Sequence, residues 1–122
     1  MLYWLVKITM AEQDDLLNNV KEFIKKARES ENDSFNVAVT LYFKAIAVLI
    51  DLFVLKKEGF IPSNHTERFR LLEKKYSLLY TILDKDFPIY QNSYRISIKK
   101  EFVEVLKNDF KKVVEFTGIK VD

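Results

Sequence analysis

The side chain best suited to chemistry in this sequence is its single histidine, His65. The chain has 122 residues with one His and no Cys, which excludes a thiol nucleophile and a zinc site built from several His and Cys ligands. Imidazole can take up or release a proton near neutral pH. Because no acid or nucleophile lies at a spacing that would pair with His65, the sequence predicts no catalytic residue, no metal site and no cofactor.

The surroundings of His65 favour a structural role. It stands four residues before Phe69, at the start of an apolar line that continues through Leu72 at helical spacing. We therefore expect a histidine at the edge of the core, kept neutral by the positive end of a helix dipole and poorly accessible to solvent. A role in binding or proton transfer is the alternative.

Basic residues are the second group of side chains that could take part in binding or chemistry. Segments 56–75 and 95–112 each hold six Lys and Arg against three acids, although the formal net charge is only +2. Such stretches can neutralise phosphates, or they can simply form solvated helix faces. The candidate contacts to RNA or a nucleotide are Arg68, Arg70, Lys74, Lys75 and Arg95, and Tyr94 and His65 are further candidate functional residues.

The element that must position these residues is the apolar stretch Phe35 to Leu55. Its part from Val37 to Leu55 has 19 residues, about the length that a bilayer requires. Lys44 and Asp51 lie inside it, and each would cost roughly 2.5 to 3.5 kcal/mol at the centre of a membrane helix. We therefore expect a buried central helix of a soluble domain and no membrane association.

The polar residues of this helix fall on one narrow stripe, which predicts either a strip facing solvent or a polar seam buried in an interface. The stripe comprises Asn36, Thr40, Lys44, Ala47 and Asp51. The rest of the circumference is apolar, more than the other helices of so small a domain can cover. We therefore expect a homodimer.

Cap residues predict where the helices begin and end. Thr9 and Glu12 form a capping box for a helix from Met10 to about Glu29. Asp33 or Ser34 should cap the central helix, and Gly59 should end it. Residues 1–9 extend the first helix, or form a strand or arm on a partner. Met10 is also an alternative start of the chain.

Two further helices complete the expected fold. One is capped by Ser63 or Asn64 and continues to about Leu83; the last runs from near Ser97 to just before Gly118. Asp84 to Ser93, which contains Pro88, should be a loop. Short connections place consecutive helices antiparallel. The predicted fold is an all-α, antiparallel, up-and-down four-helix bundle in a single domain, residues 1–122.

Three features resemble the HEPN superfamily of small helical domains. They are the segment FNVAVTLYFKAIAVLIDLFVLKKEGFIPSNH, the helix segment ERFRLLEKKYSLLYTIL and the pair Tyr94 and Arg95 ahead of the last helix. The resemblance covers roughly residues 10 to 117. It implies a HEPN-like bundle that forms a homodimer in the cytoplasm of a prokaryote, including archaea. The roles it implies are RNA cleavage in toxin–antitoxin and defence systems, RNA binding without cleavage, and partnership with a nucleotidyltransferase.

The catalytic members of this superfamily carry an Arg followed, after four to six residues, by a His. Arg95 could supply the arginine, but Lys100, Glu101 and Phe102 occupy the positions where the histidine should fall. We therefore expect a dimeric, non-catalytic module that binds RNA or a nucleotide, or that partners a nucleotidyltransferase or an antitoxin protein. The alternative is a divergent HEPN ribonuclease toxin that uses His65 with Arg68 or Arg95.

Overall fold

The computed structural model describes the backbone of residues 2–122 and the side chains of residues 10–122. Within that range the chain is all-α, as expected, with no strand. It forms five helices rather than four: α1 (Leu2–Ser30), α2 (Phe35–Glu58), α3 (His65–Lys75), α4 (Ser77–Asn92) and α5 (Lys100–Thr117).

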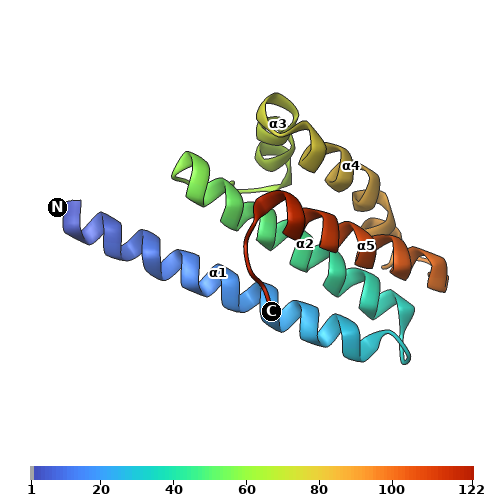
Figure 1. The fold of residues 1–122 in the computed structure, drawn as a ribbon. Coiled ribbons are helices and arrows are strands. Elements are labelled where there is room, and N and C mark those ends of the chain that lie inside the picture. Colours follow the sequence, from blue (N-terminus) through green and yellow to red (C-terminus); the bar gives the residue numbers. More distant parts are fainter. Residues whose placement is uncertain (1) are drawn as a thin grey trace.

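Helix α2 is the centre of the molecule, as the sequence predicts. Helices α1 and α5 lie along it, α4 packs against both α2 and α5, and the short α3 packs on α4 at one end (Figure 1). Burial of its apolar side chains against these neighbours drives this arrangement. By length and composition α2 could also cross a membrane, although most of it is buried inside the bundle. The cytoplasmic location therefore stays a prediction.

The predicted ends of α2 and the start of α3 are confirmed. The Ser34 side chain accepts a hydrogen bond from the N–H of Val37, and Gly59 ends α2 in the left-handed conformation at φ 86°. Asn64 caps α3 by accepting from the N–H of Glu67 at 2.9 Å. These are local interactions between residues three or four apart, which is why the sequence reveals them.

The prediction for the start of the first helix is wrong. Helix α1 already begins at Leu2, so Thr9 lies inside it and cannot be its N-cap. Residues 2–9 thus extend the helix, one of the three alternatives, because they contain neither Gly nor Pro to end it. The side chains of the apolar start up to Thr9 lie outside the described residues.

The single predicted helix from Asn64 to Leu83 is also wrong, since the chain turns at Tyr76 (φ −134°, ψ 70°) between α3 and α4. The Tyr76 hydroxyl donates to Glu58 at 2.6 Å, and its ring packs edge-on against Phe53 at 5.0 Å. Both partners belong to α2. Contacts with the central helix therefore hold Tyr76 in a non-helical conformation that no local signal indicates.

The predicted loop from Asp84 to Ser93 is helical almost to its end. Helix α4 continues to Asn92 with Pro88 inside it, even though proline removes one helical hydrogen bond. On this segment Phe87 and Tyr90 stack on Phe43 of α2, with ring centroids at 5.8 and 4.4 Å. This aromatic packing offsets the cost of the proline. Helix α5 begins at Lys100, slightly after the expected Ser97.

Most of the polar stripe of α2 packs against other parts of the chain, so the expected solvent-facing strip is wrong there and holds only at the exposed Lys44. The Asn36 amide donates to the carbonyls of Ser93 and Ile96 at 2.8 and 2.7 Å, and its carbonyl accepts from the N–H of Ile98 at 2.9 Å. Further along the stripe, Asp51 is buried against α3. The stripe therefore fixes the segment after α4, and the start of α3, to the central helix.

Candidate functional site

An open cavity of about 550 Å³ is lined by the C-terminal part of α4, the segment after it and the first residue of α3. It unites three candidates that lie far apart in the sequence, namely His65, Tyr94 and Arg95. The other lining residues are Phe87, Tyr90, Gln91 and Asn92, none of which the sequence singled out as functional. Among the residues that the structure describes, no acid lines this cavity. An anionic ligand therefore meets only neutral and cationic groups.

Aromatic rings form the inner wall of the cavity. Tyr90 stacks on Phe43, and the His65 ring lies 4.9 Å from that of Phe87. Tyr94 packs edge-on against Tyr90 at 5.5 Å and donates its hydroxyl hydrogen to the Tyr90 oxygen at 2.8 Å. The neighbouring Tyr94 hydroxyl group, together with partial burial, raises the pKa of Tyr90 to about 12, so its phenol stays protonated at neutral pH.

Tyr94 is the aromatic residue of this group that is most open to solvent, with 68 % of its surface exposed. Its hydroxyl donates to Tyr90, and both Tyr94 and the exposed Arg95 line the cavity. A planar ligand could therefore stack on Tyr94 while its anionic part meets Arg95.

A buried ion pair holds His65 in place. Arg68 donates to both carboxylate oxygens of Asp51, each at 2.7 Å, and its third nitrogen lies 2.9 Å from Nδ1 of His65. A guanidinium is always protonated and can only donate, so His65 Nδ1 must accept. The neutral imidazole then carries its proton on Nε2.

The electrostatics keep His65 neutral. Burial, followed by the positive charge of Arg68, lowers the pKa of His65, and the charge of Asp51 offsets this only in part. The expected neutral histidine is thus supported, with burial rather than the helix dipole as the main cause. The expectation that solvent reaches His65 poorly is wrong, because His65 is an exposed residue. With Nδ1 engaged and Nε2 protonated, its ring offers a hydrogen-bond donor and no lone pair for a general base.

The structure divides the basic candidates into three groups. Arg95 lines the cavity described above. Arg70 and Lys74 are exposed and line a separate hollow of about 490 Å³ beside Phe60. Arg68 is committed to Asp51, and Lys75 forms an ion pair with Glu58 at 2.6 Å. The five residues therefore do not form one basic surface.

The sequence missed Tyr90 and Phe87 because they fell in a predicted loop. The sequence does contain a signal for the role of Arg68. Asp51 is the one acid in the apolar stretch from Phe35 to Leu55, and a buried carboxylate requires a cationic partner. No group of His, Cys, Asp and Glu able to hold a metal ion occurs in the described part of the chain.

Comparison with known proteins gives no relative. No family model, no curated protein and no solved structure matches this chain.

Proposed function

We propose that this chain is a non-catalytic, HEPN-like module that binds single-stranded RNA or a nucleotide at the cavity lined by His65, Tyr94 and Arg95. The observation that carries the proposal is that the exposed residues Tyr94 and Arg95 line one cavity, in which no described lining residue is acidic. Single-stranded nucleic acids are commonly held by aromatic stacking of bases combined with cationic contacts to the backbone.

Each part of the cavity has a role in this proposal. A base stacks on Tyr94, and Arg95 contacts the adjoining phosphate through its planar guanidinium. His65 donates from Nε2, and the side-chain amides of Gln91 and Asn92 offer both donors and acceptors to base edges. Phe87 and Tyr90 form the rigid wall behind these groups because they are stacked on each other and on Phe43.

The proposal includes the HEPN-like architecture and the homodimer. In it, α1, α2, α4 and α5 form the up-and-down bundle, and α3 is an additional short helix that presents His65. A nucleotidyltransferase or an antitoxin protein is the alternative partner that the resemblance implies. The support from the structure is the central α2 with helices packed around it.

Fluorescence anisotropy with a labelled single-stranded oligoribonucleotide tests the binding. We expect binding at about 50 mM salt that weakens as salt rises, since each phosphate contact on a single strand contributes roughly 0.7 to the slope of log K against log salt. Tyr94→Ala should weaken binding at least fivefold, because stacking contributes about 1 to 3 kcal/mol per base. Arg95→Gln should weaken binding and reduce the salt slope.

Lys21→Gln is the matched control, since Lys21 is an exposed cation on α1 that does not line the cavity. Arg70→Gln reports on the second hollow. Absence of binding at low salt, or equal binding by the wild type and the Tyr94 and Arg95 variants, would contradict the proposal. If only Arg70→Gln loses binding of the oligoribonucleotide, the RNA binds in the hollow beside Phe60 instead.

A divergent ribonuclease is the second candidate function, because His65 and Arg95 line the same cavity. In that mechanism Arg95 would stabilise the charged phosphate and His65 would take the proton of the 2′-hydroxyl group. The hydrogen bond from Arg68 to Nδ1 opposes it, since His65 then lacks a lone pair to accept that proton.

A further inference from the structure

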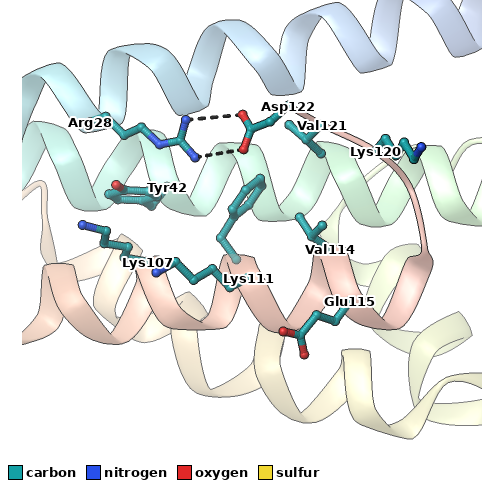
Figure 2. Close-up of a pocket in the computed structure, with 10 residues that line it drawn as sticks. Arg28, Tyr42, Lys107, Lys111, Val114, Glu115, Lys120, Val121 and Asp122 are labelled. Carbon is teal, nitrogen blue, oxygen red and sulfur yellow. Dashed lines mark hydrogen bonds and ion pairs between the residues drawn. The ribbon is translucent and has the colours of Figure 1, made fainter.

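A second cavity, of about 410 Å³, lies between α1, α2, α5 and the segment that follows α5 (Figure 2). It is built from a different set of residues than the cavity at His65. Its lining comprises Arg28, Tyr42, Lys107, Phe110, Lys111, Val114, Glu115, Lys120, Val121 and Asp122. The volume falls in the usual range for small-molecule sites.

The floor of this cavity is apolar and its rim is mainly cationic. Tyr42, Phe110 and Val121 are buried, with exposed fractions of 1, 5 and 5 %. Four cations stand around them against two acids, Glu115 and Asp122. In Figure 2, Glu115 points away from Arg28, so Asp122 is the acid that faces the cations across the cavity.

One cation of the rim is already neutralised. Glu31 accepts a hydrogen bond from the Tyr42 hydroxyl at 2.6 Å and forms an ion pair with Lys107 at 3.2 Å. The hydrogen bond from Tyr42 is the main reason why the pKa of Glu31 lies below its usual value, so Glu31 stays ionised. Arg28, Lys111 and Lys120 remain, and of these three Arg28 is the one that is paired with a carboxylate of the lining, Asp122.

The present partner of Arg28 is the side chain of Asp122. Its two carboxylate oxygens lie 3.4 and 3.5 Å from the two terminal nitrogens of Arg28, a long and parallel arrangement (Figure 2). Both side chains are more than half exposed. Such a surface pair contributes little to stability and exchanges readily with other carboxylates.

We propose that this cavity binds a small amphiphilic carboxylate, such as a medium-chain fatty acid. Its hydrocarbon chain lies on the apolar floor, where Val114 is only partly buried, and its carboxylate takes the place of Asp122 on Arg28. Asp122 shows how a carboxylate meets the planar guanidinium at two points. The apolar floor beside Arg28 fits an anion that carries a hydrocarbon chain.

Isothermal titration calorimetry with sodium decanoate as the probe tests this proposal. Acetate supplies the charge without the chain, and decanol supplies the chain without the charge. We expect decanoate to bind more tightly than either, because only decanoate both buries a hydrocarbon chain on the apolar floor and places a carboxylate on Arg28. Binding of decanol as tight as that of decanoate would overturn the role of the carboxylate.

Three variants locate the site. Arg28→Gln should weaken decanoate binding about tenfold, since it removes a charge-assisted contact. Asp122→Asn should tighten binding about two- to fivefold, because the competing carboxylate is removed. Lys25→Gln is the matched control, as Lys25 is an exposed cation of the same helix that does not line the cavity.

The direction of the Asp122→Asn effect is decisive, because no merely structural role of Asp122 would tighten ligand binding. The proposal is overturned if decanoate fails to bind, if Arg28→Gln binds it as tightly as Lys25→Gln, or if Asp122→Asn weakens binding. Binding of the oligoribonucleotide should be the same in Arg28→Gln and the wild type, which keeps this result separate from the site at His65.

Discussion

Asp51 of α2 and Arg68 of α3 form two parallel hydrogen bonds of 2.7 Å, and both residues are more than nine-tenths buried. The same guanidinium reaches His65 at 2.9 Å. One ion pair thus joins the central helix to the helix that presents the candidate site. A second, more exposed ion pair between Lys75 and Glu58 also joins α3 to α2, whereas α3 otherwise packs mainly on α4.

Removing one partner of this pair should destabilise the protein strongly. Arg68→Met leaves the Asp51 carboxylate buried without its cation, and we expect a loss of about 3 to 5 kcal/mol in the free energy of unfolding. Urea denaturation followed by circular dichroism measures this loss. Arg70→Met is the control, because Arg70 is exposed and its replacement should change stability by less than about 0.5 kcal/mol.

The double variant Asp51→Leu with Arg68→Met should be clearly more stable than Arg68→Met alone, since it leaves no unpaired buried charge. A double variant that is even less stable than the single one would show that the ion pair itself, rather than the avoidance of a lone charge, holds α3 in place.

Asp86 should make stability depend on pH. It is fully buried between α4 and α5, and neither of its carboxylate oxygens has a hydrogen-bond partner among the described residues. Burial, followed by the neighbouring Asp109 carboxyl group, raises the pKa of Asp86 to about 8 despite the nearby Lys85 and Lys112. In the folded protein this carboxyl group is therefore protonated at neutral pH.

The sign of the effect follows from linkage. The folded pKa is raised, so the folded state holds a proton that the unfolded state releases near pH 4. The stabilising contribution of protonated Asp86 is present in full below about pH 4 and is lost as the pH rises to about 8, at most about 1.4 kcal/mol per pH unit. Above the folded pKa no further change is expected.

Asp86→Asn should remove this dependence. The variant should exceed the wild type in stability at pH 8 and approach it near pH 4, as measured by urea denaturation across that range. Asp84→Asn, an exposed position on the same helix, should leave the profile unchanged. If the difference between Asp86→Asn and the wild type does not vary with pH, Asp86 is already ionised in the folded protein.

We expect no ribonuclease activity. His65 is the only histidine, its pKa is lowered, and Arg68 occupies its Nδ1. Labelled single-stranded RNA and transfer RNA should remain intact after incubation with pure protein at pH 6 to 8. Cleavage that disappears in both His65→Ala and Arg95→Ala would instead establish the ribonuclease.

The homodimer stays a prediction, but its basis has changed. The apolar surface of α2 is largely buried by the other helices of the same chain, so burying it does not require a second subunit. Helix α1, however, extends at its N-terminal end past the neighbouring helices, and Met10 on it is 59 % exposed (Figure 1). An exposed apolar residue such as Met10 can pack against a second copy.

Multi-angle light scattering at tens of micromolar should therefore give the mass of a dimer, and Met10→Glu should shift it toward the monomer. Leu78→Glu is the matched control, since it places the same charge at an exposed leucine of α4. A wild-type protein that is monomeric under these conditions would refute the dimer.

The sequence by itself determined the features that depend on neighbouring residues. Ser34, Gly59 and Asn64 mark helix ends through contacts within one turn, and the long apolar run identified α2 as the core. These signals are reliable because both partners of each interaction lie within a few positions of each other.

Only the tertiary structure decided the site. Asp51 and Arg68 are 17 positions apart, and Tyr76 leaves the helical conformation because of contacts with Phe53 and Glu58. Stacking on Phe43 keeps α4 helical through Pro88 and brings Tyr94 and Arg95 to His65. In each case packing against α2 outweighs the local preference of the chain, and packing partners distant in sequence leave no pattern that a single sequence reveals.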